Sequence, residues 1–269
     1  MEKILKAEGL TRAFENQGER FLAVRDVSFS LYRGEALGIV GESGSGKSTL
    51  VRMLTGLLAP TKGKIEFLSR DLTHAGSKEW RKCYREMQLV FQLPKESFDS
   101  GKTLGSGIGE SLRNSGLKRK EVREKVAELL STCGLTPDFA ERYPGEVSGG
   151  ECQRAAIARA LAVEPSLLIC DEATSALDVT VQKQILELLL RLKNEKKLSF
   201  LFISQNFIRF VHFFELVGSI GIVFVQVWVI FFCKFSISTF NLVLTCIFFN
   251  TKNLIIVFLC HIIPFYTHL

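Results

Sequence analysis

Hydrophobic positions along the first 206 residues follow first the period of a strand and then that of a helix. Residues 20–32 alternate apolar and polar side chains, which predicts a strand or a hairpin, and residues 36–40 form a short apolar run that ends at a glycine-rich loop. Residues 47–58 then show a helical pattern. A strand followed by a glycine loop and a helix is the beginning of an α/β unit.

The same two periods continue toward residue 206. Residues 119–132 place valine and leucine side chains on one helical stripe, and Gly134 follows as a stop signal. The glycines of residues 105–109 (GSGIG) follow no strand pattern and predict a flexible turn. The remaining predicted elements are a strand pair at 64–68 and 87–91, helices at 151–163 and 181–192, and strands at 167–170 and 198–203.

The composition changes abruptly after residue 206. Over all 269 residues the chain is 47% hydrophobic and 23% charged with a net charge of +6, which excludes a disordered chain and a disulfide-stapled miniprotein. Residues 207–269 nevertheless hold 13 of the 22 Phe and only four charged side chains. We therefore expect a domain of residues 1–206 and a hydrophobic tail of residues 207–269. Opposite charges are interspersed in the domain, as on a solvated helix face, so nucleic acid is not expected as a partner.

The glycine loop carries the first recognisable chemistry. Residues 41–49 read GESGSGKST and satisfy the pattern G-x-x-x-x-G-K-[ST] in full. Glycines let successive backbone N–H groups turn toward phosphate oxygens, a lysine ammonium reaches the β- and γ-phosphates, and a serine hydroxyl ligates Mg²⁺. The residues expected to hold a nucleoside triphosphate are Gly41, Glu42, Ser43, Gly44, Ser45, Gly46, Lys47, Ser48 and Thr49, and Ser48 is also an expected metal ligand.

A second set of chemical groups follows the apolar strand at 167–170. Asp171 and Glu172 stand directly at its end, about 120 residues after the loop. Asp171 is expected beside the metal ion, bound directly or through water. Glu172 is expected to orient or deprotonate the water that attacks the γ-phosphate.

Residues 147–161 (VSGGECQRAAIARAL) resemble the signature motif of ATP-binding-cassette (ABC) transporter ATPases. The resemblance implies a P-loop NTPase of ABC type, with a RecA-like α/β core and a helical lobe at about 93–160 that carries the signature. It also implies that Ser148, Gly149, Gly150 and Glu151 face the ATP bound by a second ATPase subunit. Small residues at a helix N-terminus suit this role, because the N–H groups there attract anions.

Three further residues match positions of the ABC family one at a time. Phe14 resembles the aromatic residue that stacks on adenine, with a core position as the alternative. Gln92 resembles the glutamine that contacts Mg²⁺ and signals to the membrane domains, so the expected metal ligands are Ser48, Gln92 and Asp171. Asp178, at the end of SALD, resembles the aspartate that reaches across the dimer interface.

The amino-acid sequences of these motifs are similar to those of the branch of the family that energises import of dipeptides, oligopeptides or nickel. The resemblance covers residues 4–204. It implies ATP and Mg²⁺ as cofactors and ATP hydrolysis coupled to transport. It also implies a second ABC ATPase subunit, identical or related, two membrane permease subunits with a substrate-binding protein, and a peripheral place on the cytoplasmic face of the cell membrane.

The resemblance ends at residue 205. The family has Ser-His-Asp after this strand, and the histidine contacts the γ-phosphate, whereas this chain has Gln205 in its place. Glutamine cannot become cationic, so we expect the loss of a contact worth roughly 2–4 kcal/mol and hydrolysis slowed by roughly 10²–10³-fold.

The tail contains three runs without charged residues, at 216–233, 235–251 and 253–269. A reading-frame lesion near codon 205 would explain both the lost histidine and the change of composition. A genuine membrane span is the second explanation, since the runs are at the short limit for one, and it would make the protein integral. A buried C-terminal lobe is the third. A catalytically impaired, membrane-tethered nucleotide-binding protein or the product of a damaged transporter gene is thus the alternative function.

Overall fold

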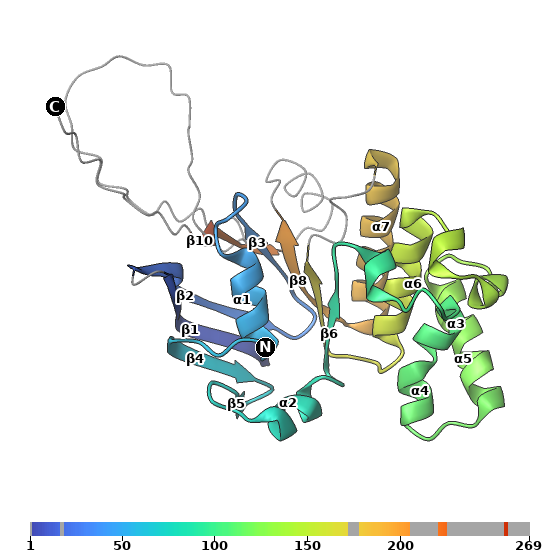
Figure 1. Cartoon of the computed structure of the whole chain (residues 1–269), viewed down its shortest axis with the longest axis horizontal. Helices are drawn as coiled ribbons and strands as arrows, with labels where there is room; N and C mark the ends of the chain where they lie inside the picture. The colour runs from blue at the N-terminus through green and yellow to red at the C-terminus, as the bar shows by residue number, and fades with distance from the viewer. Residues whose placement is uncertain (1, 17–18, 172–177, 205–219, 225–255, 258–269) are drawn as a thin grey trace, which may run out of the picture.

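A computed structural model describes the chain over residues 2–16, 19–171, 178–204, 220–224 and 256–257. Within these residues the chain forms two sheets and a group of helices (Figure 1). Two predicted catalytic residues, Glu172 and Gln205, lie outside the described residues, as does most of the hydrophobic tail.

The first sheet is antiparallel and has four strands in the order β2-β1-β4-β5. Its two long strands pair from Lys3 opposite Tyr32 to Asn16 opposite Glu19, with several register shifts along the way. Register shifts strengthen the twist of a ribbon, so the pair can curve around its neighbours. The strands are β1 (Lys3–Asn16), β2 (Glu19–Tyr32), β4 (Lys62–Phe67) and β5 (Arg70–Asp71).

The second sheet is parallel and has the order β10-β9-β3-β8-β7-β6. Its strands come from distant parts of the chain, which is usual where helical crossovers join parallel strands. They are β3 (Ala36–Val40), β6 (Met87–Val90), β7 (Leu167–Asp171), β8 (Ser199–Ser204), β9 (Ile220–Phe224) and β10 (Ile256–Val257).

Both faces of the central parallel strands are buried, and this explains their continuous apolar runs. Along β8, Phe200 and Phe202 join one buried cluster with the helices, whereas Leu201 and Ile203 join a second cluster with the antiparallel sheet. Neighbouring side chains of a strand point to opposite faces, so a strand covered on both sides needs apolar residues at every position. The antiparallel sheet and helices α3 to α6 accordingly lie on opposite sides of the parallel sheet (Figure 1).

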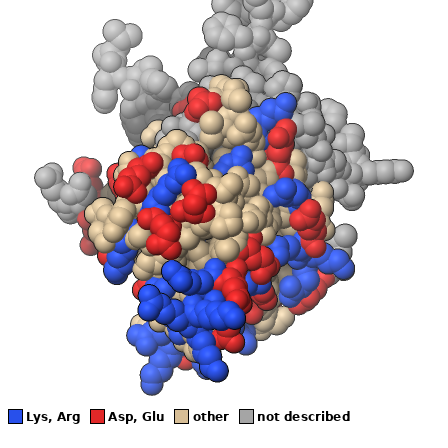
Figure 2. Space-filling model, turned by 90° about the vertical axis from the view of Figure 1, so that its right-hand side faces the viewer, with Lys and Arg blue, Asp and Glu red and all other residues tan. Residues whose placement is uncertain are grey.

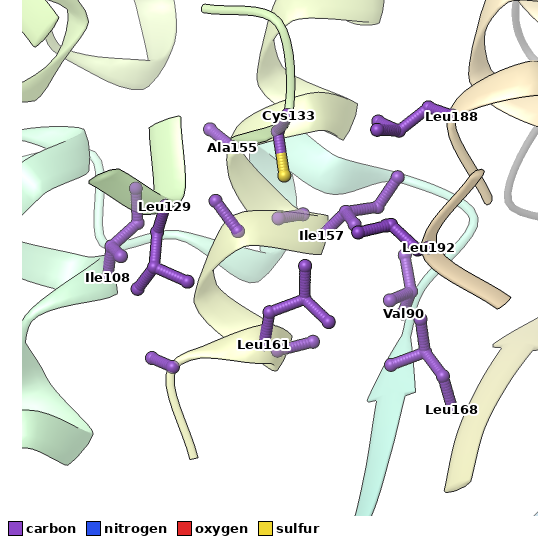
Figure 3. Packing of buried hydrophobic residues seen from close by; sticks show 14 of the residues in the cluster. Val90, Ile108, Leu129, Cys133, Ala155, Ile157, Leu161, Leu168, Leu188 and Leu192 are labelled. Carbon is purple, nitrogen blue, oxygen red and sulfur yellow. The ribbon is translucent and has the colours of Figure 1, made fainter. Parts of the chain in front are cut away.

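Helix α6 is the centre of the helix-side cluster. Ile157 and Leu161 lie in the middle of the packing, with Leu129 of α5 on one side and Leu192 of α7 on the other (Figure 3). The helices are α1 (Lys47–Leu54), α2 (Ser77–Cys83), α3 (Leu104–Ile108), α4 (Glu110–Asn114), α5 (Arg119–Thr132), α6 (Gly149–Leu161) and α7 (Val179–Lys196), with 3₁₀ turns at Pro94–Ser97, Pro137–Glu141 and Pro144–Glu146.

The predicted stripe of α5 is confirmed. Val122, Val126, Leu129 and Leu130 are all buried, and the helix ends before Gly134, whose φ of +76° is the left-handed conformation expected of a helix stop. Charged side chains of both signs are intermixed on the outer face of the helices (Figure 2). This arrangement agrees with a solvated helix face.

Three predictions about the elements are wrong. The segments around 64–68 and 87–91 do not pair: β4 lies between β1 and β5, and β6 lies beside β7 in the other sheet. The first helix ends at Leu54 rather than at residue 58, because Gly56 turns the chain with a φ of +72° against the ring of Trp80. Strand β1 is an omission in addition to the three errors, because no element was predicted for its residues.

The third error concerns the GSGIG segment, which forms helix α3 and not a flexible turn. Thr103 caps this helix by accepting a hydrogen bond from the Ser106 N–H at 3.2 Å. A Cβ atom on Gly105 would lie 2.6 Å from the Ala140 carbonyl oxygen, and one on Gly107 would lie 2.8 Å from the Phe98 ring. The glycines therefore let α3 pack closely against Ala140 and Phe98. The local sequence pattern does not reveal these contacts, because both residues lie outside the segment.

Among the described residues, no helix combines the length and apolar character needed to cross a membrane. The first charge-free run of the tail contains β9, whose backbone pairs in parallel with β3 from Ala36 opposite Ile220 to Val40 opposite Phe224.

The close contact of α3 gives a stability test. We predict that Gly105→Ala destabilises the chain by about 1–3 kcal/mol, because the new methyl group overpacks the contact with Ala140. Helix propensity alone would give the opposite sign, since alanine favours a helix over glycine by about 1 kcal/mol. Urea unfolding followed by circular dichroism measures the difference.

Gly145→Ala is the matched control, because a Cβ atom there meets nothing within 4 Å. We expect its free energy of unfolding to stay within about 0.5 kcal/mol of the unmodified chain. Equal stability of the two variants would contradict the packing argument.

Candidate functional site

The carboxyl edge of the parallel sheet collects most of the predicted site residues. The glycine loop leaves β3 at Gly41, Asp171 ends β7, and Gln92 follows β6 by two residues. All these strands are parallel, so their carboxyl ends meet at one edge. Since β8 lies between β3 and β7, Asp171 stands about 10 Å across the sheet from the start of the loop.

The Lys47 ammonium lies inside the loop. Its side chain is only 4% exposed, and Nζ donates to the carbonyl oxygens of Gly41 at 2.6 Å and Glu42 at 2.7 Å. A longer bond of 3.4 Å reaches Ser45 Oγ. The loop is thus folded around one positive charge, and a buried charge interacts with an incoming anion more strongly than a solvated one does.

Two loop glycines have positive φ angles for different reasons. Gly46 has a φ of +91°, and a Cβ atom on it would lie 2.0 Å from the Ala23 carbonyl oxygen of β2. Gly44 has a φ of +80°, but a Cβ atom there would meet nothing within 4 Å. Gly46 therefore allows contact with the β1–β2 ribbon, whereas Gly44 serves only the turn of the loop.

Helix α1 begins at Lys47 and leaves its first N–H groups without a side-chain cap. Its N-cap residue is Gly46, and its first turn contains no acidic residue. An uncapped helix N-terminus carries a partial positive charge and unsatisfied donors, which is what a phosphate group needs.

The expected metal ligands differ in exposure. Ser48 and Gln92 are exposed, and Asp171 is half-buried. The described residues contain no cluster of three or more His, Cys, Asp or Glu side chains able to hold a metal ion. A hydroxyl, an amide and one carboxylate still fit Mg²⁺, because this ion keeps several waters and is usually bound by one or two carboxylates together with substrate phosphates.

Helix α6 begins with a reciprocal capping box. Ser148 Oγ accepts from the Glu151 N–H at 3.3 Å, and Glu151 Oε2 accepts from the Ser148 N–H at 2.8 Å. Bonds from the Ser148 backbone and then its hydroxyl hold the pKa of Glu151 below its usual value. Glu151 therefore stabilises the first turn of α6.

The signature glycines and Asp178 lie close together. A Cβ atom on Gly150 would lie 2.4 Å from Val181 Cγ1 of α7, so glycine is required for the two helices to touch. Asp178 is the N-cap of α7 and accepts from the Val181 N–H at 2.9 Å. The N-termini of α6 and α7 are thus neighbours, with Ser148 and Asp178 exposed and Gly149 half-buried.

Phe14 is half-buried on β1 and belongs to neither buried hydrophobic cluster. Its ring stacks on Phe21 of β2. Sequence reasoning singled out neither Phe21 nor the contact of the ribbon with Gly46. Position 21 lies opposite position 14 only because of the register of the two strands, which the residues alone do not fix.

The family model described as "ABC transporter" matches residues 24–175. The chain belongs to the ABC transporter family. The matched residues include the glycine loop, the signature helix and Asp171, so the resemblance first noted in the sequence is confirmed.

Similar proteins carry peptide-transport names. The chain is 46% identical over 186 residues to the oligopeptide transport ATP-binding protein OppF of Haemophilus influenzae, which is 68% of this chain and 56% of that protein. It is 40% identical over 213 residues to the di/tripeptide transport ATP-binding protein DppF of Pseudomonas aeruginosa, which is 77% of this chain and 66% of that protein. The chain thus spans little more than half the length of its OppF relatives.

Solved structures share the fold. The dimeric structure of MJ0796, a bacterial ABC transporter cassette, has a TM-score of 0.73 at 27% identity and covers 82% of this chain and 94% of its own. The post-hydrolysis dimer of MJ0796 bound to ADP and Pi has a TM-score of 0.70 at 28% identity and covers 77% and 90%. The predicted α/β fold of ABC type is confirmed.

The capping box gives a test that depends on pH. The ionised Glu151 stabilises the fold fully above its ordinary pKa of 4.5, and this contribution is lost as the pH falls through the lowered folded-state pKa. Glu151→Gln keeps an oxygen acceptor that does not titrate. We predict that the variant loses less unfolding free energy than the unmodified chain between pH 5 and about pH 3. Urea unfolding at several pH values measures this, and identical losses in both proteins would refute the assignment.

Proposed function

We propose that this chain is an ATP-binding subunit of a peptide importer and that it hydrolyses ATP between two ATPase subunits. The burial of the Lys47 ammonium inside a loop at the carboxyl edge of the sheet is the observation that carries this proposal. A buried cation, an uncapped helix N-terminus and nearby oxygen ligands suit a triphosphate with its metal ion.

Each residue of the loop edge has a part in this proposal. Lys47 exchanges its bonds to loop carbonyls for phosphate oxygens, and the N–H groups of residues 41–49 hold the same phosphates. Ser48, Gln92 and Asp171 would hold Mg²⁺, which neutralises charge on the β- and γ-phosphate oxygens when it is bound. Glu172 accepts a proton from the attacking water.

The second subunit would complete the site. Ser148 and Gly149 stand at the N-terminus of α6, beside Asp178 at the start of α7, and all three are at least partly exposed. In our proposal this surface faces the γ-phosphate held by the loop of the second subunit. The dimeric cassettes among the similar solved structures support this arrangement.

The names of the relatives favour peptides over nickel as the imported substrate. In this proposal the chain binds two permease subunits that receive substrate from a binding protein, and it lies at the cytoplasmic face of the membrane. The competing function is a catalytically weak, membrane-tethered nucleotide-binding protein, which the tail composition and Gln205 favour.

Fractionation of cells that express the chain without permeases separates these functions. Alkali-resistant membrane association supports the tethered protein, whereas a subunit that reaches the membrane only through its permeases is recovered in the supernatant. Deposition of the chain in inclusion bodies supports the reading-frame lesion, in which the tail is not a selected sequence.

The loop lysine gives the first functional prediction. Lys47→Ala weakens Mg-ATP binding by about tenfold or more, because a hydrogen bond to a charged group contributes about 1.5–3 kcal/mol. The readout is the rise in melting temperature at saturating ATP, which shrinks when the affinity falls. Lys78→Ala, which removes an exposed lysine of α2, is the control and keeps the full rise. A full rise in the Lys47→Ala variant would contradict the proposed role.

Gln205 gives the second functional prediction. The unmodified chain releases phosphate from Mg-ATP roughly 10²–10³-fold more slowly than its Haemophilus influenzae relative under the same conditions, because the γ-phosphate lacks a cationic partner. Gln205→His alone does not restore the rate, since the resemblance to the family ends at residue 205 and a hydrophobic tail follows. The prediction is refuted if the unmodified chain or the Gln205→His variant releases phosphate at the steady-state rate of the relative.

A further inference from the structure

Arg159, near the end of helix α6, bonds to the chain segment that follows the expected metal ligand Gln92. Its Nη1 donates to the Ser97 carbonyl oxygen, and its Nη2 donates to Ser97 Oγ at 2.9 Å. The guanidinium carbon lies 4.3 Å from the centroid of the Phe98 ring. Arg159 is half-buried, and desolvation lowers its pKa. Two hydrogen bonds and a cation–π contact thus hold one planar group against two successive residues.

The segment bound by Arg159 is a closed turn. Ser97 ends the 3₁₀ turn Pro94–Ser97, and its hydroxyl donates to the Pro94 carbonyl oxygen at 2.7 Å. The same hydroxyl accepts from Arg159, so its donor and one of its acceptor positions are both used. Phe98 is buried and lies against Gly107 of α3. The turn is therefore fixed to the helices.

Gln92 lies in a short link between this turn and the sheet. Val90 ends β6 and is buried, and Pro94 begins the turn and is buried as well. Gln92 is separated from Pro94 by one residue, so the two are no more than about 7 Å apart along the chain. Its neighbours Phe91 and Leu93 are each 46% exposed, so their packing holds the link only weakly. The position of Gln92 depends on where the two ends of the link are held.

We propose that Arg159 is a positioning residue for Mg²⁺ binding, which keeps Gln92 at the carboxyl edge of the sheet by holding the Pro94–Ser97 turn on α6. This proposal rests on the proposed function, because it needs a triphosphate with its metal ion in the loop. Loss of the arginine leaves Lys47 and the loop in place and lets Gln92 take other positions. Replacement of a residue that orients a metal ligand typically lowers metal affinity or activity by about 10- to 100-fold.

The affinity of the full chain for ATP, measured by equilibrium dialysis in Mg²⁺ and in EDTA, tests the proposal. The ratio of the two dissociation constants is the gain that the metal ion provides. Arg159→Gln lowers this gain by about tenfold, because an amide replaces neither the paired donors nor the cation over Phe98. The affinity in EDTA stays unchanged, which also shows that the variant is folded. Arg159→Lys, which keeps a cation and a donor, recovers part of the gain.

A milder variant and a matched control accompany this measurement. Ser97→Ala removes only the hydroxyl of the same contact and lowers the gain by a smaller factor, so it decides the question if Arg159→Gln does not fold. Arg154→Gln is the control and keeps the full gain. Arg154 also lies on α6, but it bonds to the Cys133 carbonyl oxygen and to Gln184 Oε1 and not to the turn.

A double variant separates positioning from a general effect on the fold. Gln92→Ala lowers the gain by itself. Addition of Arg159→Gln to Gln92→Ala lowers the gain no further, because the arginine then has no metal ligand to position.

The outcomes separate this proposal from the proposed function. The positioning role is overturned by a full gain in both Arg159→Gln and Ser97→Ala, by additive losses in the double variant, or by an equal loss in Arg154→Gln. Equal weakening of ATP binding in Mg²⁺ and in EDTA overturns it as well, because Arg159 then acts through the fold. ATP binding without any gain from Mg²⁺ overturns the metal site together with the positioning role. Failure of the unmodified chain to bind ATP in either condition overturns the proposed function itself.

Discussion

The candidate site depends on one buried charge. Lys47 is the first residue of α1, yet its ammonium turns back and is held by the carbonyl oxygens of Gly41 and Glu42. This arrangement fixes the loop between β3 and α1 and places the positive charge beside the helix N-terminus. Burial of an ammonium is unfavourable unless other groups compensate it. A phosphate group supplies that compensation with negative charge, so the structure and the proposed ligand satisfy the same electrostatic need.

Three helices begin at predicted site residues, and their N-termini are capped differently. Those of α6 and α7 are satisfied by Ser148 with Glu151 and by Asp178. That of α1 has only Gly46 and no side-chain cap. The first N–H groups of a capped helix already donate to side chains, so the helix end is stable without a ligand. The first N–H groups of an uncapped helix are unsatisfied, and a bound anion can accept their hydrogen bonds. The difference explains why the loop is suited to hold nucleotide by itself, while the signature region is suited to present a preformed edge to a second subunit.

Much of the site was predictable because its signals are local. The loop pattern, the acidic end of β7 and the signature occur as short runs, and parallel strands bring such runs to one edge. The errors arose where the cause is tertiary. The glycines of α3 pack against Ala140 and Phe98, and the strand register sets Phe21 opposite Phe14. No residue next to these positions carries that information. Glu172 and Gln205 stay predictions, since they lie outside the described residues.

The central claim is that one loop around Lys47 binds one nucleoside triphosphate with magnesium. Equilibrium dialysis of the full chain against labelled ATP, with and without Mg²⁺, tests it most directly. The account predicts saturable uptake that approaches one ATP per chain, is strengthened by Mg²⁺ and is displaced by tripolyphosphate. Absence of uptake, or uptake indifferent to tripolyphosphate, would contradict the account, because the ammonium would then have a structural role alone.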